Sequence, residues 1–187
     1  MITRTRRFSR DEYYRMAELG IFGSDERVEL IEGEILPLSP QNKPHAGSVT
    51  RATRTLVRRF SETHDVRVQL PLDLGEHSQP EPDFALVPLG ATEAATLHPT
   101  SADLVLEVAH SSLSYDRREK SSLYARYGIP ELWVLDVQAR RLFVYRQPGE
   151  DSDAPFGWSY QRQETLSEEE QVKPLRLEGA VTVRELL

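Results

Sequence analysis

The sequence predicts a mixed α/β domain in which helices flank a mixed β-sheet. Three observations support this fold class. Apolar residues recur at helical spacing in 44–62 and 116–127, several short apolar runs have the length of strands, and the run at 132–135 is apolar throughout. A continuous apolar run is typical of a strand covered on both faces, so we expect helices on both sides of the sheet.

The first half of the chain is expected to alternate helices and strands. A capping box, with Ser9 and Glu12 three residues apart, opens a helix that ends near Leu19. A strand at 28–36, interrupted by a turn at its glycine, precedes a long helix at 44–62 whose apolar residues form one stripe. Three short strands are expected next, at 66–70, 84–87 and 104–109.

In the second half, a helix is expected from Asp116, as its N-cap, to Tyr127, because Gly128 marks a helix end. A final short helix is indicated by Thr182 and Glu185. No internal repeat or low-complexity linker divides the chain, so we expect a single domain over residues 1–187. The remaining strands are expected at 132–135, 141–145 and 158–162, the last two as antiparallel additions.

Length and composition narrow the class of protein. The chain has 187 residues, 39% hydrophobic and 28% charged, as expected of one globular domain with its own core. No apolar stretch approaches the roughly 18 residues of a membrane span, and the N-terminus lacks the apolar core of a signal peptide. Cysteine is absent, which excludes thiolate metal sites and a disulfide scaffold. We therefore expect a cytoplasmic protein that does not associate with membranes.

The net charge of −7 argues against a chain-wide electrostatic attraction to nucleic acid. The sequence still predicts a local basic surface, because Arg51, Arg54 and Arg58 fall on one face of the long predicted helix. Two interpretations of this stripe remain open. It contacts DNA phosphates, or it is an ordinary solvated helix face.

Glu107 is the most informative residue of the chain. In the predicted strand 104–109, alternation places Glu107 between Val105 and Ala109 on one face. A carboxylate in the middle of an apolar strand is costly unless it is paired or binds a cation. The alternative is a glutamate that faces solvent at the edge of the sheet.

Lys120 strengthens the interpretation of Glu107 as a site residue. It shares one stripe of the predicted helix with Leu123, Tyr124 and Tyr127, which are apolar or aromatic. If this helix packs across the preceding strand, the lysine reaches the face that carries Glu107. The alternative is that the stem packs while the ammonium extends into water.

Asp83 directly precedes the apolar run 84–87, and Pro82 helps to set the entry into that strand. An aspartate at a strand start is more often a turn or cap residue, so Asp83 becomes informative only together with Glu107 and Lys120. Two carboxylates and one fixed cation supply hard oxygen ligands, which suit Mg²⁺ and phosphoryl-transfer chemistry.

The combination of Pro82-Asp83, an acidic residue on an apolar strand and a following lysine resembles the PD-(D/E)XK nuclease superfamily. More narrowly, the chain is similar to the Uma-type family of bacterial restriction endonucleases. The likeness covers nearly the whole chain and is most specific in the block 104–145. It implies a restriction-endonuclease-like fold, with a mixed sheet flanked by helices.

One position departs from the superfamily pattern. The superfamily lysine, two residues after the acid on the same strand, is replaced here by Ala109. The resemblance to the narrower family implies that the lysine has moved to the following helix, which assigns its role to Lys120. If Lys120 does not reach the site, a role in binding alone becomes the better interpretation.

Three further residues are candidates for the site. Glu29 matches an acid that such nucleases place near the first helix–strand junction, although it could equally be a solvent-facing strand residue. His45 and Tyr124 are candidates for supporting the site, while a core or capping histidine remains the alternative for His45. The other histidines, which show no metal-ligand spacing, are interpreted as surface or loop residues: His64, His77, His98 and His110.

The resemblance implies a Mg²⁺-dependent endonuclease that hydrolyses DNA phosphodiester bonds, with Mn²⁺ as a substitute metal. Asp83, Glu107 and the backbone carbonyl of Val108 would hold the metal, while Lys120 orients water and Glu29 assists. Two alternatives remain open: an inactive module of the same fold that binds nucleic acid or protein, and a metal-dependent phosphodiesterase with a non-DNA substrate. Cutting both strands of a duplex suits a homodimer or a higher homo-oligomer.

Overall fold

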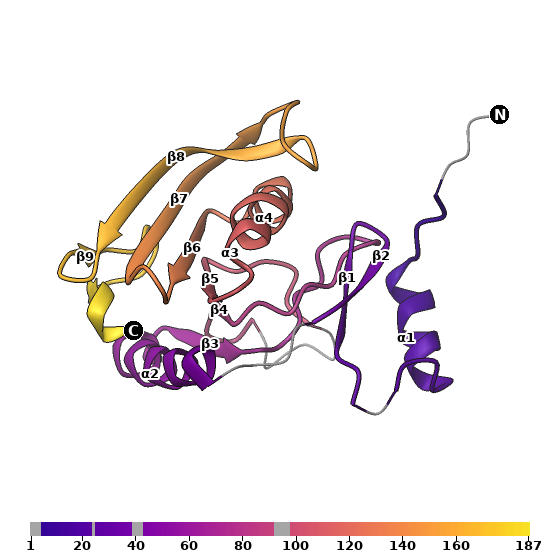
Figure 1. Ribbon diagram of the computed structural model, residues 1–187, viewed down its shortest axis with the longest axis horizontal. Helices are drawn as coiled ribbons and strands as arrows, with labels where there is room; N and C mark the ends of the chain where they lie inside the picture. The colour runs from indigo at the N-terminus through magenta and orange to yellow at the C-terminus, as the bar shows by residue number, and fades with distance from the viewer. Residues whose placement is uncertain (1–4, 24, 39–42, 92–97) are drawn as a thin grey trace.

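The computed structural model describes residues 5–23, 25–38, 43–91 and 98–187. Its centre is a six-stranded sheet in the order β3-β4-β5-β6-β7-β8 (Figure 1). Among these strands, β5 and β6 pair in parallel and all other neighbours are antiparallel. The predicted mixed sheet is thereby confirmed. The strands are β3 (His64–Val68), β4 (Phe84–Pro88), β5 (Leu104–Ala109), β6 (Glu131–Asp136), β7 (Arg141–Glu150) and β8 (Trp158–Ser167).

One face of the sheet is covered by the long helix α2 (Lys43–Phe60), which lies beneath the strands in Figure 1. Its apolar stripe, which includes Ala52, Leu56 and Phe60, is fully buried. These side chains pack in one core with the residues of β4 to β7 that point toward the helix. The predicted long amphipathic helix is therefore confirmed, within two residues at each end.

The other face is covered by a helical segment that begins with α3 (Leu113–Tyr115), continues as the π-helical turn η1 (Asp116–Lys120) and ends as α4 (Ser121–Arg126). Leu123, Tyr124 and Ala125 pack there in a second core. The expected start of this helix at Asp116 is wrong. Ser112 is the N-cap, and Asp116 lies buried within the helix.

A separate hairpin is formed by β1 (Val28–Ile31) and β2 (Glu34–Pro37), as the glycine inside the predicted strand suggested. Glu32 and Gly33 make the turn with φ of 48° and 85°, a geometry that tight hairpin turns require. Leu30 bridges to Gln79 and ties the hairpin to the segment before β4. Helix α1 (Arg10–Glu18) has the predicted capping box and lies on the outer side of this hairpin (Figure 1).

Strand ends differ from the sequence-based expectation where pairing extends beyond the apolar pattern. β7 and β8 continue their ladder through polar residues to Glu150 and Ser167. The short pair β9 (Gln171–Val172) and β10 (Val181–Thr182) was not expected, whereas the final helical turn η2 (Val183–Glu185) has the predicted capping box. No helix within the described ranges has the length and apolar character needed to cross a membrane.

Candidate functional site

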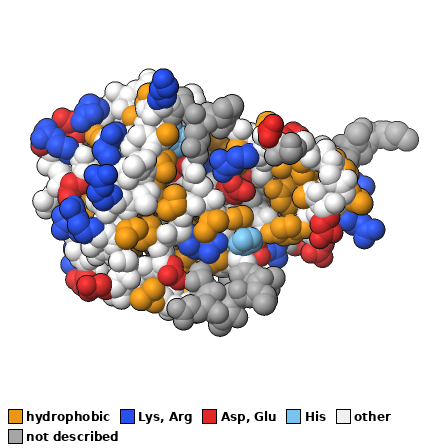
Figure 2. All heavy atoms as spheres, turned by 90° about the horizontal axis from the view of Figure 1, so that it is seen from below, with side chains coloured by type: hydrophobic (Ala, Val, Ile, Leu, Met, Phe, Trp, Pro, Cys, Tyr) orange, Lys and Arg blue, Asp and Glu red, His pale blue; other side chains and the backbone are white. Residues whose placement is uncertain are grey.

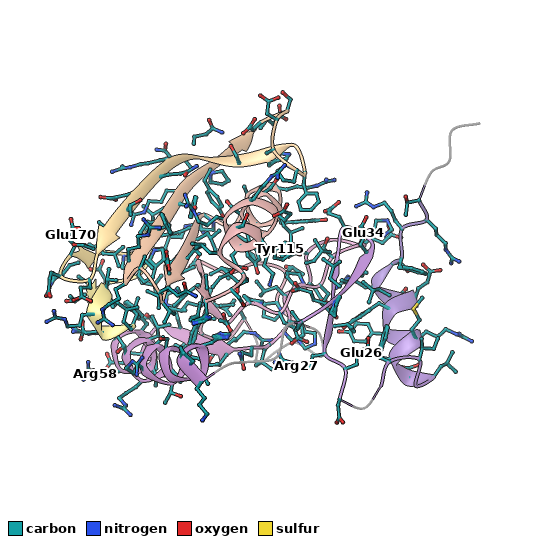
Figure 3. The ribbon with its side chains drawn as sticks, in the orientation of Figure 1. Glu26, Arg27, Glu34, Arg58, Tyr115 and Glu170 are labelled. Atoms are coloured by element: carbon teal, nitrogen blue, oxygen red, sulfur yellow. The ribbon has the colours of Figure 1, made fainter. Side chains whose placement is uncertain are left out.

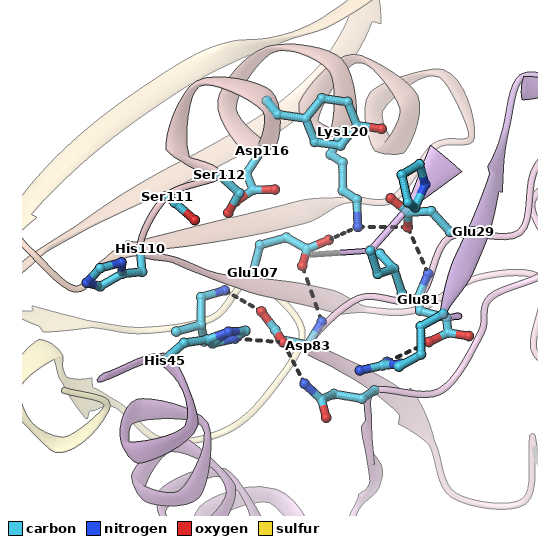
Figure 4. Close-up of a pocket in the computed structure, with 16 residues that line it drawn as sticks. Glu29, His45, Glu81, Asp83, Glu107, His110, Ser111, Ser112, Asp116 and Lys120 are labelled. Atoms are coloured by element: carbon cyan, nitrogen blue, oxygen red, sulfur yellow. Dashed lines mark hydrogen bonds and ion pairs between the residues drawn. The ribbon is translucent and has the colours of Figure 1, made fainter. Parts of the chain in front are cut away.

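A hollow of about 150 Å³ opens where β4 begins and β5 ends, between the start of α2 and the helical segment on the other face of the sheet. This volume is enough for several water molecules or for an ion with part of its water shell. Polar and charged side chains converge on it (Figure 4). Those that carry the following description are Glu29, His45, Gln69, Asp83, Glu107, Ser112, Asp116 and Lys120.

Asp83 is fixed at the entry to β4 by hydrogen bonds on both of its oxygens. Oδ2 accepts from the backbone N–H of Val108 at 2.8 Å. Oδ1 accepts from Nε2 of Gln69 at 3.1 Å and lies 3.1 Å from Nε2 of His45. In an extended strand the N–H and C=O of one residue project to the same side, so the carbonyl of Val108 faces the same hollow.

Glu107 is 4% exposed and points from β5 toward α4, on the face that it shares with Val105 and Ala109. Its Oε2 accepts the backbone N–H of Asp83 at 3.2 Å. Its Oε1 accepts the hydroxyl of Tyr124 at 2.6 Å and the ammonium of Lys120 at 3.2 Å. The buried carboxylate is therefore held by donors from two segments of the chain, the entry to β4 and the helical segment, as a buried charge requires.

Lys120 does not extend into water. Its Nζ lies 3.0 Å from Oε2 of Glu29 and 3.2 Å from Oε1 of Glu107, and the residue is 4% exposed. Burial alone would lower the pKa of Lys120, but the two carboxylates outweigh burial and raise this pKa well above its ordinary value. The two carboxylates thus favour the charged form of Lys120, which links the hairpin to the central sheet.

Glu29 enters the site from β1, on the hairpin. It is 2% exposed, so the interpretation as a solvent-facing residue is wrong. The same Oε2 that contacts Lys120 accepts the backbone N–H of Glu81 at 3.3 Å. The structure thus brings six of the residues singled out in the sequence into one cluster of hydrogen bonds and ion pairs: Glu29, His45, Asp83, Glu107, Lys120 and Tyr124.

The charges of this cluster do not balance. Three carboxylates, from Glu29, Asp83 and Glu107, face one ammonium, from Lys120. An excess of carboxylate oxygen at the wall of a water-sized hollow fits a hard divalent cation such as Mg²⁺. In the described part of the chain no three His, Asp or Glu side chains enclose an ion by themselves.

Sequence reasoning missed part of the hollow. Gln69 gave no signal, because it reaches Asp83 through a left-handed backbone turn (φ 51°) after β3. Asp116 stands four residues before Lys120 on the same helix, and this spacing could have identified it. His110 does lie in a loop, as expected, but it lines the hollow. His64, also interpreted as a surface or loop residue, is instead buried in β3 beside Asp103.

The three arginines of the α2 stripe are exposed and do not line the hollow. Figure 2 shows basic side chains gathered over the part of the surface that α2 forms. Arg58 points outward at the far side of α2 from Arg27, which lines the hollow (Figure 3), and it pairs with Glu185 at 3.2 Å. Contact of Arg51, Arg54 and Arg58 with DNA stays a prediction.

A mixed sheet with a carboxylate pair at adjacent strand ends and a lysine between two acids defines a restriction-endonuclease-like domain. A solved structure, described as a putative nuclease belonging to DUF820 from Anabaena variabilis ATCC 29413, superimposes with a TM-score of 0.69. The two chains are 16% identical, and the match covers 96% of this chain and 97% of that chain. At this identity the likeness establishes the fold.

The family follows from the sequence itself. The model of the Uma2 family, described as putative restriction endonucleases, matches residues 10–184. The chain belongs to this family. No curated protein sequence matches it.

Proposed function

We propose that this protein is a metal-dependent endonuclease that hydrolyses DNA phosphodiester bonds in the hollow beside Asp83 and Glu107. The observation that carries the proposal is the contact of Lys120 with both Glu29 and Glu107, at 3.0 and 3.2 Å. An ammonium buried between carboxylates at the edge of a polar hollow is well placed to stabilise negative charge on a phosphate. Family membership supports nuclease activity.

Mg²⁺, or Mn²⁺ in its place, would supply Lewis-acid polarisation of the phosphate and lower the pKa of an attacking water. Asp83 and Glu107 are the residues that would hold the ion, with the carbonyl of Val108. Gln69 and His45 keep the carboxylate of Asp83 in one orientation through its Oδ1. This preorganisation limits the rearrangement needed when substrate arrives.

Lys120 has two tasks in this proposal. Its fixed ammonium stabilises the charge that develops on the phosphate oxygens, and it orients the attacking water through its remaining N–H group. Tyr124 and Glu29 hold the partners of that ammonium in place, through the 2.6 Å hydrogen bond to Glu107 and the 3.0 Å ion pair. In this proposal the lysine on η1 performs the task that the superfamily assigns to a strand lysine.

The test is cleavage of supercoiled plasmid with Mg²⁺ or Mn²⁺, comparing wild type with Asp83→Asn and Lys120→Met. Wild type is expected to nick or linearise the plasmid only with metal, and each variant is expected to lose at least about 100-fold in rate. Matched controls are Asp153→Asn and Lys173→Met, which change exposed residues of the same types. Both controls are expected to cleave like wild type.

The outcomes separate the proposal from its alternatives. Cleavage of small phosphodiesters without cleavage of any DNA would replace DNA by another substrate at the same site. Tight binding of DNA or protein by a well-folded wild type that cleaves nothing would identify a binding module. Loss of activity in Asp83→Asn alone would remove Lys120 from the mechanism.

We further propose that the active form is a homodimer or a higher homo-oligomer, because two sites related by a two-fold axis match the antiparallel strands of a duplex. The molar mass measured by light scattering, with and without a DNA duplex, tests this proposal. A mass of one chain of 21.4 kDa under both conditions, with linear plasmid as product, would contradict it.

A further inference from the structure

Arg27 is an exposed positive charge at the rim of the hollow, and the mechanism above gives it no task. Among the described residues that line the hollow, the lysine and arginine side chains are those of Lys120 and Arg27. Lys120 is buried between Glu29 and Glu107, whereas 48% of the Arg27 side chain is exposed. A substrate that approaches from solvent therefore meets the guanidinium of Arg27 before the ammonium of Lys120.

The hairpin fixes the backbone of Arg27. The ladder between β1 and β2 extends one residue before Val28, because the N–H of Leu38 donates to the C=O of Arg27 at 2.8 Å. Side chains two residues apart in a strand project to the same side, and Arg27 and Glu29 both line the hollow. The hairpin thus places a guanidinium next to the carboxylate that contacts Lys120.

An acidic side chain holds Arg27 at this rim. In the described part of the chain, the ion pair of Arg27 is from its Nη2 to Oε2 of Glu81, at 2.8 Å. Pro82 restricts Glu81 to extended conformations, and the N–H of Glu81 donates to Glu29 at 3.3 Å. Figure 4 shows Glu81 beside Glu29 at one end of the site. Both members of the ion pair therefore project from fixed backbone.

This ion pair leaves most of the guanidinium available. Arginine has five N–H donors in a planar fork that can hold two oxygens of one phosphate, and Glu81 accepts from a single nitrogen. An ion pair between exposed side chains contributes little to stability, and the Glu81 side chain is itself 22% exposed. A phosphate can therefore displace the carboxylate of Glu81 at small cost.

The position of Arg27 also matches the repeat of a nucleic-acid strand. Arg27 and Glu29 are two residues apart along an extended strand, which separates their Cα atoms by about 6 to 7 Å. Consecutive phosphates of a DNA strand are separated by a similar distance. A phosphate that is cleaved beside Lys120, which lies 3.0 Å from Glu29, therefore has its neighbour within reach of Arg27.

We propose that Arg27 is a substrate-binding residue, which holds the DNA phosphate adjacent to the cleaved one, and that Glu81 occupies its guanidinium until DNA arrives. The inference rests on the proposed function, because it places DNA in the same hollow. It accounts for the entry of a polyanion into a site rich in carboxylates, on a chain whose net charge is −7. The attracting charge lies at the rim and is paired with an acid while no DNA is bound.

The first test is Arg27→Gln, which removes the charge and keeps a polar side chain. On a short duplex that wild type cleaves, KM is expected to rise about 10-fold, as for the loss of one charge-assisted contact. The kcat is expected to stay close to that of wild type, because Lys120 and its carboxylates are unchanged. The matched control is Arg6→Gln, which breaks an exposed ion pair with Glu12 away from the hollow and should leave KM unchanged.

A neutral analogue shows which phosphate Arg27 contacts. Two duplexes each carry an uncharged methylphosphonate, one step to either side of the bond that wild type cleaves. At one of these positions wild type is expected to lose about 10-fold in kcat/KM. Arg27→Gln is expected to lose no more than about 2-fold there, because its contact is already absent. Equal losses in both proteins at both positions overturn the assignment of Arg27.

Glu81→Gln tests the second part of the proposal. The variant keeps the shape of the side chain but removes the charge that competes with phosphate, so KM is expected to fall by up to about 5-fold. In the Arg27→Gln background this gain should disappear, because no guanidinium is left to release. An equal fall in both backgrounds would reflect a general loss of negative charge and would overturn the role of Glu81.

Binding of DNA without metal separates these outcomes from failure of the nuclease. The dissociation constant of a short duplex is measured by fluorescence anisotropy over a range of salt concentrations. Arg27→Gln is expected to weaken binding and to reduce the slope of log Kd against log salt by about one. An unchanged slope together with an unchanged KM overturns the role of Arg27 and leaves the nuclease in place.

A wild type that binds DNA but cleaves nothing overturns the proposed function, and the binding comparison then decides whether Arg27 holds a phosphate. A wild type that neither binds nor cleaves DNA overturns both the proposed function and the role of Arg27.

Discussion

Replacement of Lys120 by methionine tests the charge balance of the site without any assumption about substrate. Methionine retains the length of the buried stem but removes the ammonium that lies 3.0 Å from Glu29 and 3.2 Å from Glu107. Both carboxylates then stay buried without a cation. Breaking a buried ion pair from one side costs about 3 to 5 kcal/mol, so we expect a loss of this size in the free energy of unfolding at pH 8.

The loss should depend on pH, with a sign that follows from burial. In Lys120→Met the pKa of Glu107 is raised further above its unfolded value, because burial already raises it and the opposing ammonium is gone. A raised carboxyl pKa gives stability that is present below the unfolded value and is lost as pH rises through the folded value. The variant should therefore be closer to wild type at pH 5 than at pH 8.

Urea denaturation of metal-free protein at both pH values measures these differences. The control is Lys173→Met, which removes an exposed lysine and should change stability by less than about 0.5 kcal/mol. A loss below about 1 kcal/mol for Lys120→Met, or an equal loss at both pH values, would refute the idea that Lys120 holds two ionised carboxylates.

Three more predictions concern residues around the site. Gln69→Leu removes one donor from Asp83 and should lower stability by about 1 kcal/mol in urea denaturation, whereas Gln69→Gly also relieves the left-handed backbone and should lose less. Arg117→Ala removes the hydrogen bond of 2.7 Å to Tyr145, and should lower the melting temperature by a few degrees, with Arg118→Ala as a neutral control. Glu185 has a pKa lowered by the backbone N–H at its helix cap and by Arg59, so Glu185→Gln should be less stable than wild type above pH 5, and the difference should vanish as pH falls below that lowered pKa.

The sequence correctly predicted the parts of the molecule whose residues follow a regular strand or helix period. Strand parity places Glu107 with Val105 and Ala109, and the structure buries all three on the side of α4. Helical spacing likewise turns Lys120 toward the same face. Both predictions rest on the fixed side-chain periods of strands and helices, which do not depend on the rest of the fold.

The features that the sequence did not predict depend on irregular backbone conformation. The helix starts before Asp116, and its N-cap Ser112 makes no side-chain capping hydrogen bond. Residue preferences at helix ends therefore do not identify this start. Gln69 reaches Asp83 only because the chain turns left-handed after β3. The length of the β7–β8 ladder also depends on pairing between the two strands. Many of its residues are polar, so the apolar pattern of the sequence does not predict how far the ladder extends.

The parallel pairing of β5 and β6 has a consequence for how the site is held together. Parallel neighbours need a crossover connection, and residues 110–130 form that connection and carry Asp116 and Lys120. The crossover packs against the sheet through Leu123, Tyr124 and Ala125. Glu107 lies on β5, before the crossover, whereas the ammonium that links it to Glu29 comes from the crossover itself. The pairing of β5 with β6 fixes both ends of this crossover, so a contact between two strands determines where Lys120 lies relative to Glu107.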